Sequence, residues 1–98
     1  MKEVAAQLLA DVTLYTTDKG GRLGPTPPEW FGCPCKINRG DFQGWDCRIL
    51  LGGTSMSPGE TRRVEMIFLS PEQALPLFRA AGVFFLWEGR VIGEGRVV

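Results

Sequence analysis

Short stretches of alternating apolar and polar residues, separated by turns rich in glycine and proline, run through this sequence and strongly limit its fold. The clearest case is the closing segment Val83–Val98, in which two such stretches flank a Glu88-Gly89 turn. Glycine suits a tight hairpin turn because it adopts a positive φ without strain. Alternation of this kind is typical of half-buried strands. The sequence therefore predicts a β-hairpin at its end.

Four more segments with the same alternation precede the hairpin. They predict strands over residues 6–14, 31–38, 45–51 and 61–69, joined by loops. Pro34 would restrict the second strand to a sheet edge or a bulge. The inward positions of the strands predict a core made of Leu8, Val12, Leu14, Ile37, Ile49, Val64, Met66, Phe68, Phe85 and Val97.

Helix signals occur at one place, after the fourth of these segments. Ser70 can cap a helix and Pro71 suits its first position. Pro76 follows closely, so we expect one short helical element near residues 71–80, of one or two turns, ending by Gly82. About six strands and little helix predict an all-β fold, a small barrel or sandwich. The length of 98 residues predicts one domain, 1–98.

The charge balance excludes a strong global field. Eleven basic residues offset eleven acidic ones, so net charge would not draw the protein to nucleic acid or to an anionic membrane. No apolar run approaches the roughly 20 residues that span a bilayer. An odd number of cysteines, three, fits a reducing compartment. With no secretory-type segment at the start, we expect a cytoplasmic protein without a membrane partner.

Residues that carry common catalytic chemistry are scarce. The chain contains no histidine, which excludes Ser-His-Asp and Cys-His nucleophile systems. It also contains no phosphate-binding P-loop motif, so no bound nucleotide is expected. We therefore predict a protein that is not an enzyme and has no cofactor.

Three cysteines offer the remaining chemical alternative. Cys33, Cys35 and Cys47 could supply three thiolate ligands to a soft metal. The one-residue spacing and the lack of a fourth cysteine or histidine favour packing in the core instead. No metal is predicted, and a thiol or metal site stays as the alternative reading.

Basic residues gather around a long loop rich in proline and glycine. Lys19 and Arg22 lie in the loop, Lys36 and Arg39 follow it, and Trp30 lies between them. Cationic side chains interleaved with aromatic rings can bind a phosphate backbone. The alternative is a solvated loop face with its aromatic rings turned into the core.

Four segments in order resemble one known family. They read TTDKGGR followed by TP, DFQG, SPGE and WEGRVIGEGRVV, at residues 16–27, 41–44, 57–60 and 87–98. Together they resemble the C-terminal β-barrel (domain III) of elongation factor Tu, over residues from about 11 to 98. The resemblance implies a six-stranded antiparallel β-barrel, which agrees with the number of strands expected from alternation.

The same resemblance implies a contact region. In the family, this barrel contacts the T-stem of aminoacyl-tRNA and packs on the GTPase domain. Gly20, Gly21, Arg22 and Thr26 match the loop that forms part of that tRNA surface, whereas Leu23 stands where the family has histidine.

These observations together predict a stand-alone, non-catalytic binding module. It would engage an unknown protein partner or an RNA through the loop of residues 19–31. The alternative is a translation-related protein that binds a tRNA-like RNA stem. The predicted contact residues are Lys19, Gly20, Gly21, Arg22, Thr26, Trp30, Lys36 and Arg39.

Overall fold

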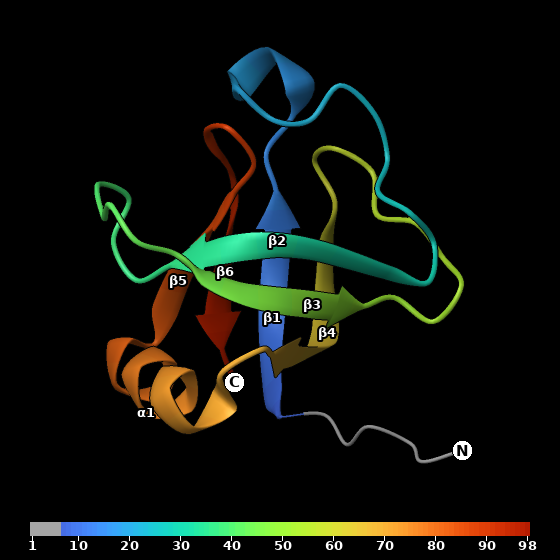
Figure 1. Ribbon diagram of the computed structural model, residues 1–98. Coiled ribbons are helices and arrows are strands. Elements are labelled where there is room, and N and C mark those ends of the chain that lie inside the picture. Colours follow the sequence, from blue (N-terminus) through green and yellow to red (C-terminus); the bar gives the residue numbers. More distant parts are fainter. Residues whose placement is uncertain (1–6) are drawn as a thin grey trace.

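Six antiparallel strands close into a barrel in the computed structural model, which describes residues 7–98 (Figure 1). The strand order around the barrel is β1-β4-β3-β2-β5-β6, and β6 pairs back with β1. The strands are β1 (Leu8–Leu14), β2 (Trp30–Lys36), β3 (Trp45–Leu50), β4 (Thr61–Phe68), β5 (Val83–Trp87) and β6 (Val91–Val97). The predicted small six-stranded antiparallel barrel is confirmed.

The core fills the barrel with side chains that alternate along each strand. The burial pattern of β1 repeats every second residue, as expected for a strand with one face inward. The fully buried large side chains include Leu14, Ile49, Met66, Phe78, Phe84 and Leu86. Of the predicted core, Leu8, Val12, Leu14, Ile49, Val64, Met66 and Phe68 are buried.

The prediction that Phe85 is the inward residue of β5 was wrong. Phe84 is fully buried, and its neighbour Phe85 is only partly buried. Two consecutive phenylalanines give no alternation from which to choose the inward one. Ile37 and Val97 are partly buried and pack against the core. The predicted first strand begins at residue 6, which lies outside the described residues.

The helix is longer than predicted. α1 (Pro71–Ala81) has 11 residues and continues through Pro76. Proline removes the amide that would bond to the carbonyl of Glu72, and both residues are exposed on the solvent side. Packing of the buried Phe78 opposes this cost. The helix ends at Gly82, as predicted, and Gly82 adopts a left-handed conformation there. No helix in residues 7–98 has the length and apolar character to cross a membrane.

The pairing of β2 explains how the barrel tolerates a proline. Pro34 pairs with Asp46 of β3, but β2 registers with β5 only at Cys35–Leu86 and Lys36–Phe85. Pro34 precedes that short seam, so one side of β2 is unpaired there and behaves as an edge. The predicted edge position of Pro34 is confirmed within a closed barrel.

Loops gather at one end of the barrel and α1 lies toward the other (Figure 1). The end of the barrel where the loops gather holds a 3₁₀ turn (Thr17–Lys19), the segment that carries Met56 and the turn at Gly89. At the helical end, the Phe78 ring lies 4.8 Å from that of Phe68 and 5.4 Å from that of Phe84, centroid to centroid. The predicted contact loop starts at the end where the loops gather, next to the 3₁₀ turn, and runs along the side of the barrel to the start of β2 (Figure 1).

Candidate binding surface

Arg22 ties the long loop to the β5–β6 turn. One of its guanidinium nitrogens donates to both carboxylate oxygens of Glu88, at 2.7 and 2.5 Å. The other nitrogens donate to the carbonyls of Gly24 and Pro25, both at 3.3 Å. The guanidinium also lies 4.8 Å from the centre of the Phe31 ring. The Arg22 side chain thus stabilises the fold of the loop through contacts within the protein.

Thr26 joins the same loop to the segment before β4. Its hydroxyl accepts the Met56 amide at 2.9 Å and donates to the Pro27 carbonyl at 3.0 Å, while its own amide donates to the Met56 carbonyl. Only 5% of Thr26 is exposed. Its position serves the loop's structure and gives a partner little to contact.

The two glycines of the loop shape its backbone. Gly20 has φ 93°, a conformation that favours glycine. A Cβ on Gly21 would lie 2.0 Å from the Tyr15 carbonyl oxygen, so no side chain fits there. Arg90 donates to the carbonyls of both glycines, at 2.7 and 3.1 Å. Both glycines therefore hold the loop against the rest of the barrel.

The charged groups of Lys36 and Arg39 also contact aromatic rings within the protein. The Lys36 ammonium lies 3.7 Å from the centre of the Trp87 ring, and Lys36 is 8% exposed. The Arg39 guanidinium lies 5.4 Å from the Tyr15 ring centre and 5.0 Å from that of Phe85, and it donates to the Tyr15 hydroxyl. Such cation–π contacts hold both side chains against the barrel.

The predicted contact residues therefore do not form one surface. Trp30 and Lys36 begin and end β2, so their backbones are about 20 Å apart at 3.3 Å per residue. Lys19 lies exposed in the 3₁₀ turn and Trp30 is 45% exposed. Trp30 is the one aromatic residue among the predicted contact residues, and it is exposed.

A broader surface surrounds Trp30 on the outer side of β2, β3 and β4. We call it the Trp30 face and define it by Trp30, Gly32, Pro34, Asp46, Arg48, Ile67 and Leu69. These residues line a hollow of about 550 Å³. Leu69 is 78% exposed and extends the apolar surface next to Trp30. The Trp30 face thus combines an aromatic ring, aliphatic side chains and one charge of each sign.

Trp30 lies between two hollows. The second, of about 520 Å³, is lined by the loop residues Pro27, Pro28 and Glu29 together with Arg22 and Glu88. A Cβ on Gly32 would lie 2.9 Å from the indole ring, so the ring extends over this glycine. The Arg48 guanidinium lies 4.3 Å from the ring centre on the Trp30 face. The indole is therefore fixed in place while nearly half of it stays exposed.

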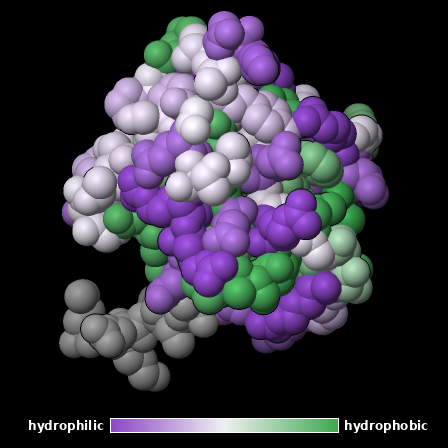
Figure 2. All heavy atoms as spheres, turned by 180° about the vertical axis from the view of Figure 1, so that it is seen from behind, coloured by the Kyte–Doolittle hydropathy of each residue, from purple (hydrophilic) through white to green (hydrophobic). Residues whose placement is uncertain are grey.

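The opposite side of the barrel has a different character. Figure 2 shows it from behind, with hydrophilic residues surrounding separate hydrophobic patches. On the outside of the β1–β4 pair, Arg63 forms a two-bond ion pair with Asp11, at 2.8 and 3.1 Å. The Arg63 guanidinium lowers the pKa of the Asp11 carboxyl. Charge pairs of this kind are typical of a solvated sheet face.

Sequence reasoning missed Ile67 and Leu69. Both share the parity of Glu65, which is exposed and opposite in parity to the predicted core residues Val64 and Met66. Apolar residues on the polar side of a strand were the available signal, since an exposed apolar patch often marks an interaction site. Pro34 and Gly32 share the outward parity of Trp30 in the same way.

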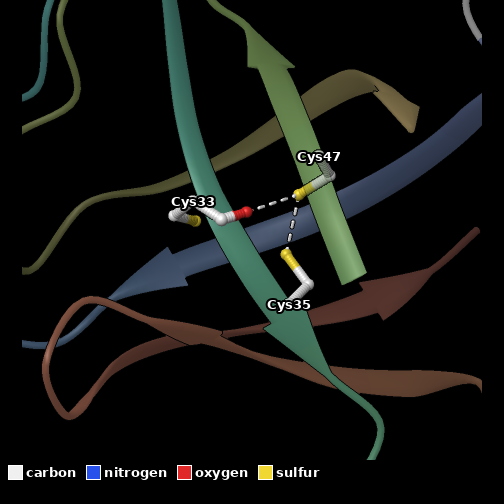
Figure 3. A group of neighbouring side chains, drawn as sticks. All are labelled: Cys33, Cys35 and Cys47. Carbon is white, nitrogen blue, oxygen red and sulfur yellow. Dashed lines mark hydrogen bonds between the residues drawn. The ribbon is translucent and has the colours of Figure 1, made fainter. Parts of the chain in front are cut away.

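The three cysteines meet inside the barrel, beneath the Trp30 face. Cys33 and Cys35 face inward from β2, as expected from their shared parity, and Cys47 is the β3 partner of Cys33. Figure 3 shows the Cys47 sulfur directed at the Cys35 sulfur, 2.8 Å away, and at the Cys33 carbonyl, 3.3 Å away. All three sulfur atoms lie within 4.8 Å of one another. All three residues are buried free thiols.

The neighbouring sulfurs separate the acidities of the thiols. Hydrogen bonds from Cys35 and then Cys47 hold the pKa of Cys33 well below its usual range. Hydrogen bonding to Cys33 raises the pKa of Cys35 and of Cys47, and burial acts in the same direction. The pKa of Cys33 is therefore shifted in the opposite direction from those of the other two thiols.

Comparison with known proteins gives no family for this chain. No protein-family model matches it, and no curated protein matches it significantly. The relationship to the elongation factor Tu barrel therefore stays a prediction.

Proposed function

We propose that this protein is a non-catalytic binding module that takes a protein partner on the Trp30 face. The observation that carries the proposal is Trp30 itself, a 45% exposed indole held between two hollows. Fixed aromatic side chains at the centre of a patch are the usual anchors of protein interfaces. Pro27 and Pro28 of the predicted contact loop line the second hollow, so this half of the loop takes part in the surface.

The composition of the face favours a protein over RNA. Asp46 and Arg48 place one charge of each sign on it, so a phosphate backbone would meet repulsion as well as attraction. Of the basic residues predicted to contact RNA, Arg22 is paired with Glu88, and Lys36 lies buried against Trp87. An apolar segment of a partner protein would cover Ile67 and Leu69.

The test is retention of a protein from an extract of the source organism by the immobilised chain. We expect one defined protein to be retained by the wild type and lost with Trp30→Ala and with Leu69→Asp. Leu77→Asp, at an exposed position of α1, is the matched control and should retain it. With the purified partner, Trp30→Ala should weaken binding by about 2 kcal/mol, or about 30-fold.

Three results would overturn the proposal. One is a chain that retains no protein, and another is retention that Trp30→Ala leaves unchanged. The third is retention that nuclease abolishes, or binding to purified tRNA that weakens steeply with salt and is lost in Arg22→Ala. That last result would establish the RNA-binding alternative instead.

A further inference from the structure

The buried cysteines form an arrangement that core packing alone does not require. Three sulfur atoms from two neighbouring strands converge within 4.8 Å in the described part of the chain. The Cys35 and Cys47 sulfurs are 2.8 Å apart, which brings two thiols closer than an ordinary core contact between apolar atoms. Barrel geometry produces this convergence, because Cys33 and Cys47 are register partners and Cys35 is the diagonal neighbour.

We propose that Cys33, Cys35 and Cys47 form a three-sulfur site for a soft monovalent metal ion, the chemical class of cuprous copper. Thiolates prefer such ions, and three of them supply a complete trigonal shell. This site is separate from the partner surface and does not depend on it.

The dimensions of the trio suit one ion. Three sulfurs in a plane around a metal, each at a bond length of about 2.3 Å, are about 4 Å apart. The Cys35 and Cys47 sulfurs are 2.8 Å apart, closer than that value, and no two of the three sulfurs are more than 4.8 Å apart. Binding one ion would therefore require the Cys35 and Cys47 sulfurs to separate by about 1 Å.

The ligand set selects against zinc. Structural zinc takes four ligands in a tetrahedron. Within residues 7–98, no aspartate or glutamate joins the three cysteines, and the chain contains no histidine. Three sulfurs complete the shell of an ion that accepts three ligands, whereas zinc would need a water or another group as its fourth ligand.

The trio lies close beneath the surface. Cys33 and Cys47 also line the 550 Å³ hollow of the Trp30 face, while their side chains face the interior of the barrel. Each thiol that binds as a thiolate releases one proton to solvent, so affinity should fall as the pH falls.

The experiment is an anaerobic titration of the reduced protein with Cu(I) in competition with a coloured Cu(I) chelator. We expect one copper per chain and an X-ray absorption spectrum with three sulfur neighbours and no nitrogen or oxygen. Cys33→Ser, Cys35→Ser and Cys47→Ser should each weaken binding at least tenfold. Ile49→Val, a core change two residues from Cys47, should leave it unchanged.

If a serine variant fails to fold, the X-ray absorption spectrum of the wild-type copper complex still counts the sulfur ligands. A copper with two sulfur neighbours, or with nitrogen or oxygen in its shell, would overturn the proposal. The proposal would also be overturned if the chelator retained all the copper in the competition. A folded Cys33→Ser variant that binds Cu(I) as tightly as the wild type would overturn it as well. Zn²⁺ displacing Cu(I) at equal concentration would overturn the assignment of ion class.

Discussion

The buried ring of Phe84 occupies the space that a side chain on Gly95 would need. The two residues are register partners on β5 and β6, and a Cβ on Gly95 would lie 2.1 Å from the ring. The closing strand therefore carries glycine at this position to admit a phenylalanine from its neighbour.

Replacing Gly95 should overpack this part of the core. We expect Gly95→Ala to lower the free energy of unfolding by about 1–3 kcal/mol, measured by urea denaturation. Gly40→Ala is the control, because nothing lies within 4 Å of the added Cβ. That control should stay within about 0.5 kcal/mol of the wild type. Equal stability of the two variants would show that Phe84 is not held over Gly95.

Removing the Phe78 ring should loosen the helical end of the barrel. Phe78 is fully buried and contacts the rings of Phe68 and Phe84. We expect Phe78→Ala to cost about 3–5 kcal/mol of stability. Leu77→Ala, at the adjacent position of α1 and 47% exposed, should cost much less. Similar losses from both would mean that α1 docks with a different face.

Arg22 should matter more to stability than Glu88. The Arg22 side chain is 19% exposed and that of Glu88 is 45% exposed, so the ion pair alone contributes about 0.2–1 kcal/mol. Arg22→Ala also leaves the carbonyls of Gly24 and Pro25 without their donor, and should cost about 1–3 kcal/mol. Thermal and urea unfolding of Arg22→Ala and Glu88→Gln would measure the difference. A larger loss with Glu88→Gln would contradict this account.

The Thr26 hydroxyl should be needed for its hydrogen bond to Met56. Thr26→Val keeps the shape of the side chain but leaves the Met56 amide without its side-chain acceptor. We expect a loss of about 1–3 kcal/mol in unfolding free energy. Thr26→Ser keeps the hydroxyl and should lose less. If the two variants are equally stable, the hydroxyl contributes nothing to the loop.

Glu60 should contribute to the loss of stability in acid. The Ser57 amide and then Arg62 hold the pKa of Glu60 below its ordinary value of 4.5. A depressed folded-state pKa gives stability that is complete above pH 4.5 and lost as the pH falls through the folded value. Glu60→Gln should therefore be less stable than the wild type at pH 7, with a gap that narrows toward pH 3. A gap between Glu60→Gln and the wild type that stays constant with pH would remove Glu60 from the acid transition.

Much of the barrel follows from local pattern. Alternation in β4 places Val64, Met66 and Phe68 inward. The β5–β6 turn contains Gly89, whose φ of 74° is one that glycine adopts without strain. The choice between Phe84 and Phe85 depends instead on which residue faces Gly95 of the neighbouring strand, a relationship between strands that alternation within β5 does not contain.

The candidate sites were harder to predict, because they depend on pairing between strands. Arg22 has the charge of a contact residue, but its partner Glu88 lies 66 positions away. The spacing of Cys33 and Cys35 argues against a metal site when read alone. Cys47 becomes their neighbour only through the β2–β3 register. Leu69 joins Trp30 on one surface because β4 pairs with the other side of β3.

The barrel can open locally between β2 and β5, which register at only two residue pairs. Separating these strands breaks fewer backbone hydrogen bonds than separating β2 from β3, which register at six pairs. Partial opening of this kind needs less free energy than global unfolding. Cys35 lies on the seam, so strand separation would expose its sulfur while the other pairings stay intact. We therefore expect the rate at which the fully buried sulfur reacts to follow local opening, not unfolding of the whole chain.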